Sequence, residues 1–384
     1  MDASVLLDAC ISAGIDFFTG VPDSFLKGLC DELFARFGAE GVAHMVAHNE
    51  GGAIGLCAGH YLASGRPALC YMQNSGLGNA VNPLASLMDG EVYALPCLLV
   101  VGWRGAPGEK DEPQHRKQGK ITLEQLDLLG IPWRILTKET TDAAFRQDFE
   151  ALTKALMRKQ TAALVVRKGA LTSAAHPSYN NANTLTREEA AARVLAAAGA
   201  EDVFVSTTGK LSREVFELRE ARQEGHARDF LTVGSMGHAS MIALRIALER
   251  PDRRVWCLDG DGALMMHLGG LPLIGNRRPD NLIHVVINNG AHETVGGMPV
   301  CDGSLNIQAL AHAAGYASVF SAETADALSA RLEEMLSLPP SGPILLEIRC
   351  ANGARADLGR PTTTPVQNRD SFMNFLNVTK SSYF

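Results

Sequence analysis

The stretch VWCLDGDG, at residues 255–262, joins a short apolar run to a turn made of two aspartates and two glycines. A second apolar run, residues 282–287, ends in the pair Asn288-Asn289. The segment between them has the pattern of a helix, so the whole stretch predicts a strand–helix–strand unit of a parallel sheet. We therefore expect Asp261 and Asn289 at the carboxyl ends of two nearby strands, the edge at which open α/β sheets bind ligands.

The side chains at this predicted edge suit a hard metal ion. One carboxylate and one amide oxygen make a partly filled oxygen site, which fits Mg²⁺ that takes its other ligands from water and a diphosphate. Gly260 and Gly262 allow the backbone to approach such an anion, and a helix expected to begin near Ala263 would direct its first N–H groups there. By itself the GDG triplet is more often a tight turn than a metal site, but the Asn pair that follows it across a strand–helix–strand unit favours the metal site.

The alternation of apolar runs and helical patterns extends over all 384 residues. It predicts parallel sheets covered by helices on both faces. Polar residues interrupt it at 173–185, where we expect a linker, and a capping box of Thr186 and Glu189 starts the next helix. We expect two doubly wound α/β domains, residues 1–172 and 186–384, with no middle domain. The expected strands are residues 16–21, 42–46, 68–72, 97–101, 163–166, 203–206, 230–233, 255–258, 282–287 and 344–348.

Composition narrows the classes of function. The formal net charge is −7 and the basic residues are scattered, which argues against nucleic-acid binding. No apolar run approaches the roughly 18 residues that cross a bilayer, and the acidic start does not resemble a signal peptide. The eight cysteines form no CxxC pair, so we expect reduced thiols in a cytoplasmic protein without a membrane partner.

Glu50 is the candidate catalytic residue of the first domain. It stands in the stretch HNEGGA, residues 48–53, just after a predicted strand and at the head of a helix. In isolation, a glutamate in this position is more often a charge that the helix dipole stabilises.

The GDG turn, the Asn pair and this placement of Glu50 resemble the thiamine-diphosphate enzyme superfamily. The resemblance implies that Asp261 and Asn289 bind Mg²⁺ through their side chains, with the backbone carbonyl of Ala291 as a further ligand. It also implies that Glu50 hydrogen-bonds to the pyrimidine ring of the cofactor and so promotes loss of the thiazolium proton.

The stretch GSMG, residues 234–237, matches the position at which the superfamily supports the bent cofactor. The resemblance implies that Met236 is the supporting side chain and that the Gly234 carbonyl accepts from the pyrimidine amine. Without it, Met236 would be read as a core methionine before a helix.

Longer stretches resemble one family of the superfamily, the phosphonopyruvate decarboxylases, which release CO₂ from 3-phosphonopyruvate and leave phosphonoacetaldehyde. Sulfopyruvate decarboxylases resemble the first few of these stretches, and they are the alternative. The loop at residues 292–299 departs from the pattern, with Thr294 where Ser and Met298 where Gln are expected. The matching stretches are residues 20–25, 73–79, 82–84, 102–105, 111–115, 234–239 and 359–365.

A phosphonate substrate requires positive and hydrogen-bonding groups, because it carries roughly two negative charges besides its carboxylate. The candidates for binding it are Arg104, Lys110, His115 and Lys210. His115, Asp23 and His292 are the candidates for proton transfer, in that order.

The superfamily also implies a homodimer or a higher homo-oligomer, with cofactors between the first domain of one subunit and the second domain of its neighbour. Two rival interpretations fit less well. A carboligase would usually carry a middle domain, for which the linker leaves no room, and a non-catalytic subunit would have lost its Glu50. A P-loop ending at Gly209-Lys210 is excluded by Phe204 and Leu211.

Overall fold

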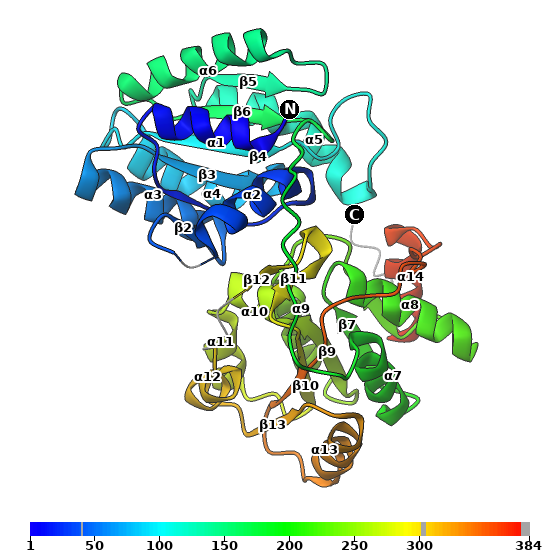
Figure 1. Cartoon of the computed structure of the whole chain (residues 1–384). Coiled ribbons are helices and arrows are strands. Elements are labelled where there is room, and N and C mark those ends of the chain that lie inside the picture. Colours follow the sequence, from blue (N-terminus) through cyan, green and yellow to red (C-terminus); the bar gives the residue numbers. More distant parts are fainter. Residues whose placement is uncertain (40, 301–304, 378–384) are drawn as a thin grey trace, which may run out of the picture. The chain divides into compact units, whose positions relative to one another are not determined.

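The computed structural model describes residues 1–39, 41–300 and 305–377. Within this range the chain forms two compact units (Figure 1). The first unit comprises Met1–Tyr179 and His292–Val300, and the second comprises Asn180–Ala291 together with residues 305–377. Residues 173–185, the expected linker, contain no helix or strand.

The first unit is built around one six-stranded, all-parallel sheet in the order β2-β1-β3-β4-β6-β5. Helices α1, α2 and α6 pack on one face, and α3, α4 and α5 pack on the other. Its strands are β1 (Phe18–Gly20), β2 (His44–Val46), β3 (Ala68–Gln73), β4 (Cys97–Gly102), β5 (Trp133–Leu136) and β6 (Ala162–Val166). Its helices are α1 (Ala3–Ser12), η1 (Ser24–Leu26), α2 (Lys27–Phe37), α3 (Glu50–Ser64), η2 (Asn74–Gly76), α4 (Leu77–Pro83), η3 (Leu84–Met88), α5 (Pro113–Leu128) and α6 (Asp142–Met157).

The second unit repeats this architecture with the strand order β13-β14-β10-β9-β7-β8, again all parallel. Helices α7, α8 and α13 cover one face, while α9, α11, α12 and α14 cover the other. Its strands are β7 (Val203–Ser206), β8 (Asp229–Leu231), β9 (Val255–Gly260), β10 (Leu282–Asn288), β13 (Ser318–Ala322) and β14 (Ile344–Arg349). Its helices are α7 (Arg187–Ala197), α8 (Lys210–Arg222), α9 (Ala239–Glu249), α10 (Asp261–Met266), α11 (Gly270–Arg277), α12 (Ile307–Ala314), α13 (Ala325–Ser337) and α14 (Pro365–Phe375).

The prediction of two doubly wound α/β sheets is confirmed, and each expected strand is present. The short pair β11 and β12 was not predicted, and two strands of the six-stranded sheets were also missed, β5 and β13, which are both at sheet edges. Their side chains are mostly half-buried, so they lack the continuous apolar run that marks an interior strand. The capping box of Thr186 and Glu189 is also confirmed.

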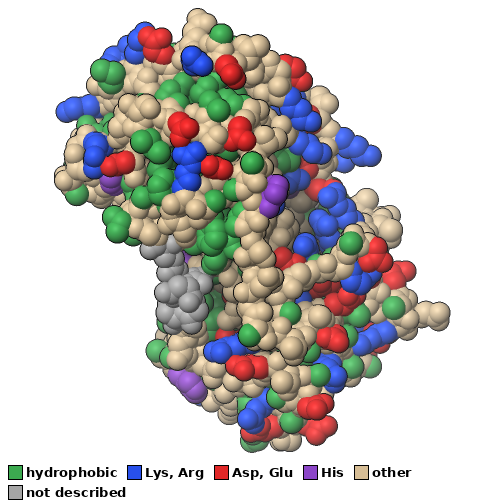
Figure 2. Space-filling model, viewed as in Figure 1, with side chains coloured by type: hydrophobic (Ala, Val, Ile, Leu, Met, Phe, Trp, Pro, Cys, Tyr) green, Lys and Arg blue, Asp and Glu red, His purple; other side chains and the backbone are tan. Residues whose placement is uncertain are grey.

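The described cysteines support the expectation of reduced thiols. Seven of them are free and buried, and Cys301 lies outside the described residues. On the face shown in Figure 2, Lys and Arg side chains are interspersed with Asp and Glu on both units. None of the helices in the described part of the chain has the length and apolarity needed to cross a membrane.

A buried ion pair joins α8 to the edge strand β8. The Arg219 guanidinium donates to both carboxylate oxygens of Asp229 at 2.9 Å, and neither side chain is exposed. From α14, the Asn368 side chain donates to the Asp229 backbone carbonyl at 2.7 Å and accepts from the Leu231 N–H at 3.1 Å. These contacts hold the edge strand between α8 and the C-terminal helix.

Replacing Arg219 by methionine should lower the free energy of unfolding by about 3–5 kcal/mol, because Asp229 would stay buried without its partner. Denaturant unfolding measures this change. The matched control is Arg331→Met on α13, which breaks an exposed pair with Glu334 and should cost less than about 1 kcal/mol. Equal costs for the two variants would contradict the assignment of Arg219–Asp229 as a buried anchor.

Candidate functional site

Asp261 lies where β9 passes into α10, at the carboxyl edge of the second sheet. The strand continues to Gly260 and the helix begins at Asp261, two residues before the expected start. The Asp261 side chain is buried, and its Oδ2 has no hydrogen-bond partner among the described residues. Burial, reinforced by the charge of Asp259, raises the pKa of Asp261 to about 7, although the backbone N–H groups of Gly262 and Gly290 act in the opposite direction.

The loop that carries Asn289 begins at the end of the neighbouring strand β10. Asn288 fixes its start, donating to Glu347 Oε1 at 2.8 Å and accepting from the Gly290 N–H at 3.1 Å. Gly290 has a φ of +70°, which glycine adopts without strain. The Asn289 side chain is buried, and its Oδ1 accepts from the Ala291 N–H at 3.1 Å.

The structure thus brings Asp261 beside the Asn289–Gly290–Ala291 turn, as the sequence predicted for two strand ends. A buried carboxylate oxygen without a protein donor is expensive unless something else neutralises it. The adjoining turn carries two further hard oxygen donors, the Asn289 amide and the backbone carbonyl of Ala291, and donors of this kind fit Mg²⁺.

The stretch that contains Gly234 and Met236 lies between β8 and α9, and both residues are half-buried. Gly237, with a φ of +85°, packs so closely on α10 that an added Cβ would lie 2.8 Å from the Ala263 carbonyl oxygen. The loop therefore lies against the helix that Asp261 begins. Lys210 is the first residue of α8, after the carboxyl end of β7 in the same sheet.

In the first unit, Glu50 is the first residue of α3 and is buried. Asn49 caps this helix by accepting from the Gly52 N–H at 2.7 Å. Asn79 donates to Glu50 Oε2 at 2.8 Å, and Gly76 lies so close that any Cβ there would collide with the Glu50 carboxylate. The glycine-rich stretch after β3 therefore encloses the Glu50 carboxylate.

Asp23 lies at the carboxyl end of the same sheet, where it caps η1 by accepting from the Phe25 N–H at 2.9 Å. Its side chain is buried, which raises its pKa, although Gln73, which donates to it at 2.6 Å, partly offsets that effect. Arg104, after β4, also acts on the Asp23 carboxyl through its positive charge. These contacts place one protonatable carboxyl group beside a fixed cation.

Arg104 is held by a bidentate ion pair with Asp111, at 2.7 Å and 2.6 Å. A third donor, Nη1, reaches Ser24 Oγ at 3.1 Å, and the guanidinium lies 4.8 Å from the centre of the Phe25 ring. Asn74 donates to the Arg104 backbone carbonyl at 2.8 Å. Arg104 therefore already has a carboxylate partner in this structure.

His115 lies in the first turn of α5 and is buried. Burial and the positive charge of Arg104 lower its pKa to about 4, although Asp111 acts in the opposite direction. Its Nδ1 has no hydrogen-bond partner among the described residues. At neutral pH its imidazole is therefore uncharged and able to accept a proton.

Sequence reasoning used residues 73–79 only as a family signature and did not assign them a contact. Gln73 contacts Asp23, Asn74 contacts Arg104, and Asn79 contacts Glu50. The signal that could have identified them is the position of this polar, glycine-rich stretch directly after a buried strand.

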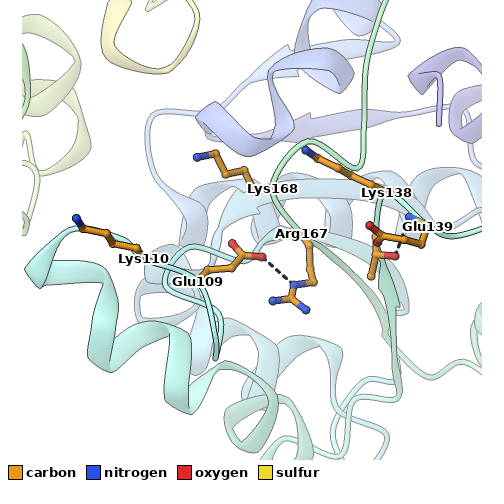
Figure 3. Close-up of a pocket in the computed structure, with 7 residues that line it drawn as sticks. Glu109, Lys110, Lys138, Glu139, Arg167 and Lys168 are labelled. Atoms are coloured by element: carbon orange, nitrogen blue, oxygen red, sulfur yellow. Dashed lines mark hydrogen bonds and ion pairs between the residues drawn. The ribbon is translucent and has the colours of Figure 1, made fainter.

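Lys110 lies in a pocket of about 380 Å³, whose lining includes neither Asp23 nor Arg104. Figure 3 shows the Glu109–Arg167 ion pair, 2.9 Å long, at its centre. More cationic than anionic side chains line it, so it suits a small anion better than a cation. The pocket is formed by the loops after β4, β5 and β6, with the lining residues Glu109, Lys110, Thr137, Lys138, Glu139, Arg167 and Lys168.

The loop that departs from the family pattern forms β11 (Ala291–His292), η4 (Glu293–Val295) and β12 (Met298–Pro299). From His292 to Val300 it belongs to the first unit, where Met298 joins the hydrophobic core. Burial and the neighbouring His48 lower the pKa of His292 to about 4. The residue range expected for the second domain thus contains a segment that packs in the first unit.

Each of the two domains matches a domain of the same group of enzymes. Residues 3–128 match the thiamine pyrophosphate enzyme N-terminal TPP binding domain, and residues 207–348 match the C-terminal TPP binding domain of the same enzymes. The match to the first domain includes Glu50, and the match to the second includes Asp261 and Asn289.

Two curated relatives are similar over nearly the whole chain. The phosphonopyruvate decarboxylase of Streptomyces viridochromogenes is 34% identical, covering 97% of this chain and 94% of the relative. That of Streptomyces hygroscopicus is 33% identical, covering 98% and 94%. The sulfopyruvate decarboxylase of Methanosarcina acetivorans is 27% identical and covers 75% of this chain and 76% of its own length.

The lowered pKa of His115 predicts a contribution to the pH dependence of stability. The unfolded chain takes up a proton at this residue as the pH falls below about 6.5, whereas the folded chain takes it up only near pH 4. The contribution of His115 to the free energy of unfolding is therefore fully present above pH 6.5 and is lost as the pH falls from 6.5 to 4. Denaturant unfolding at several pH values gives the free energy of unfolding as a function of pH. Between pH 4 and 6.5 this free energy should change less steeply with pH in His115→Gln than in the parent protein.

The control is His176→Gln, because His176 is exposed in the linker. Between pH 4 and 6.5 its free energy of unfolding should change with pH as steeply as that of the parent. An unchanged slope in the His115 variant would mean that this imidazole is solvated in the native protein.

Proposed function

The chain belongs to the phosphonopyruvate decarboxylase family of thiamine pyrophosphate enzymes, and from this premise we propose that it converts 3-phosphonopyruvate to phosphonoacetaldehyde and CO₂. The observation that carries the proposal is similarity to phosphonopyruvate decarboxylases over at least 97% of the chain, with Glu50, Asp261 and Asn289 all present. The reaction belongs to phosphonate biosynthesis.

We propose that Mg²⁺ is held by Asp261, Asn289 and the Ala291 carbonyl, against the diphosphate of the cofactor. The orphaned Oδ2 of Asp261 supports this assignment, because a metal ion would replace the missing hydrogen-bond donor. Gly260 and Gly262 flank Asp261 and let the backbone approach the diphosphate. When bound, thiamine diphosphate supplies an electron sink for the bond that breaks as CO₂ leaves.

We propose that Glu50 hydrogen-bonds to the pyrimidine ring and sets its protonation state. Burial and the hydrogen bond from Asn79 hold the carboxylate in one position, as such a role requires. The Gly234 carbonyl would accept from the pyrimidine amine, and the half-buried Met236 would support the bent cofactor.

His115 and Asp23 are the proposed groups for proton transfer. The pKa of the His115 imidazole is lowered to about 4 and the pKa of the Asp23 carboxyl group is raised, and such opposed shifts are typical of groups that exchange protons with a substrate. Both experience the charge of Arg104, which would also attract an anionic substrate.

For the phosphonate group we propose Arg104, Lys110, His115 and Lys210 as the binding candidates. Because Arg104 already pairs with Asp111, a phosphonate would share that guanidinium with the carboxylate. Lys110 would act from the cationic pocket of Figure 3, which could first receive the substrate.

The proposed assembly is a homodimer or a higher homo-oligomer, in which the first domain of one subunit and the second domain of its neighbour share each cofactor. The proposal is supported by the separation of Glu50 and Asp261 into different domains. We also propose a cytoplasmic location, which the free, buried cysteines support.

The alternative substrate is sulfopyruvate, which the Methanosarcina acetivorans relative favours. Release of CO₂ from 3-phosphonopyruvate, sulfopyruvate and pyruvate, each with thiamine diphosphate and Mg²⁺, distinguishes the candidates. We expect kcat/KM to be highest for phosphonopyruvate by at least about tenfold, a difference of about 1.4 kcal/mol in transition-state stabilisation. Faster turnover of sulfopyruvate would establish the alternative, and no release from any substrate would contradict a decarboxylase.

Two variants test the cofactor assignments. Glu50→Gln should still bind thiamine diphosphate but lose about 10²–10⁴-fold in activity, because the amide cannot set the protonation of the pyrimidine. Proton–deuterium exchange at the thiazolium carbon should slow in parallel.

The variant Asp261→Ala should lose most of its affinity for Mg²⁺ and the cofactor but should still unfold in a cooperative transition, since the carboxylate that it removes lacks a full set of hydrogen-bond partners among the described residues.

The same two variants test the assembly. In a mixed dimer of Glu50→Gln and Asp261→Ala chains, shared sites would place both lesions in one site and leave the other intact. Mixing the inactive variants should then restore up to about half of the activity per mixed dimer. Mixed dimers without activity would show that each site is built within one chain.

A further inference from the structure

The backbone carbonyl of Asn289 accepts hydrogen bonds from two asparagine side chains. Asn181 Nδ2 donates to it at 2.9 Å and Asn352 Nδ2 at 2.8 Å. A carbonyl oxygen has two lone pairs, so these amides fill its hydrogen-bonding capacity. This feature, the Asn289 clamp, fixes the peptide that follows a proposed Mg²⁺ ligand.

The two donors come from distant parts of the chain. Asn181 lies in the segment that sequence analysis identified only as a linker, and its side chain also donates to the Cys350 carbonyl at 3.0 Å. Asn352 lies two residues beyond Cys350, after the end of β14. The linker also continues alongside this segment, because the Ala351 N–H donates to the Leu185 carbonyl at 2.8 Å.

The clamp acts where the sheet stops supplying hydrogen bonds. Strand β10 ends at Asn288, so the Asn289 carbonyl lies beyond the ladder with β14. Gly290, with its φ of +70°, leaves the backbone free to adopt other conformations, and rotation of this peptide would change the direction in which the Asn289 amide and the Ala291 carbonyl point. Metal sites tolerate displacements of only about 0.5 Å, and the partners that orient ligands typically change affinity by about 10–100-fold.

We infer that Asn181 and Asn352 are positioning residues for the Mg²⁺–thiamine diphosphate site. This inference rests on the proposed function. Through Asn181 the linker becomes part of the support of the metal loop, and by linkage occupancy of the site stabilises the linker by the same free energy. The segment that joins the two domains is thus coupled to the cofactor.

The variants Asn181→Ala and Asn352→Ala each remove one donor to the Asn289 carbonyl. The matched control is Asn183→Ala, because Asn183 donates to the Cys350 carbonyl at 3.0 Å and has no bond to Asn289 among the contacts of the described residues. We expect Mg²⁺ dissociation constants, titrated calorimetrically with thiamine diphosphate present, to rise about tenfold or more in the first two variants. The control should change by less than about twofold.

Two further measurements separate positioning from loss of structure. At saturating Mg²⁺ and cofactor, kcat should stay within about twofold of the parent, because excess metal restores the occupied loop. In the metal-free protein, hydrogen exchange of the Ala291 amide, which donates to Asn289 Oδ1, should speed up in Asn181→Ala and Asn352→Ala but not in Asn183→Ala. In the parent, Mg²⁺ and thiamine diphosphate should slow exchange of the linker amides around Asn181.

Unchanged Mg²⁺ affinity in both Asn181→Ala and Asn352→Ala, with normal affinity in the parent, would overturn the inference and leave the proposed function standing. A fall in kcat that saturating Mg²⁺ does not reverse would also overturn it. If one variant does not fold, the other still tests the inference, because it removes the second hydrogen bond to the same Asn289 carbonyl. A parent protein that binds neither Mg²⁺ nor thiamine diphosphate would instead refute the proposed function, and this inference with it.

Discussion

The burial of the Asp261 carboxylate at the end of β9 is the constraint on which the second domain depends. Its Oδ2 has no partner among the described residues, and burial raises its pKa to about 7. Such a group weakens a fold unless the surrounding backbone is held firmly and a cation completes the site. The turn after β10, the glycines beside Asp261 and the asparagines on the Asn289 carbonyl all serve that one requirement.

The first domain also buries carboxyl groups near the ends of its strands. Glu50 and Asp23 are both buried near strand ends, and one stretch, residues 73–79, hydrogen-bonds to both. Gln73 is the last residue of β3, a central strand, and Asn79 lies in α4, which follows that strand after η2. The end of a central strand therefore holds Asp23, and the helix that follows it holds Glu50.

Several features of the fold could be predicted from local pattern. The interior strands are continuous apolar runs, because parallel strands covered on both faces can tolerate little else. Edge strands such as β5 and β13 are half-buried, so their sequences carry a weaker signal. The positions of Asp261 and Asn289 could also be predicted, since each directly follows a strand that an apolar run marks. Glu50 is the first residue of the helix after β2, and only the resemblance to a known superfamily singled it out.

By itself the sequence determined the two α/β domains, the family and the polar residues at each strand end, because these depend on short-range periodicity and on motifs of a few residues. Only the tertiary structure decided that Arg104 pairs with Asp111, that His115 is uncharged, and that Asn181 binds the carbonyl of Asn289. The physical reason is that a pKa depends on burial and on charges from other elements, and a side-chain-to-backbone bond across 108 positions leaves no trace in local pattern.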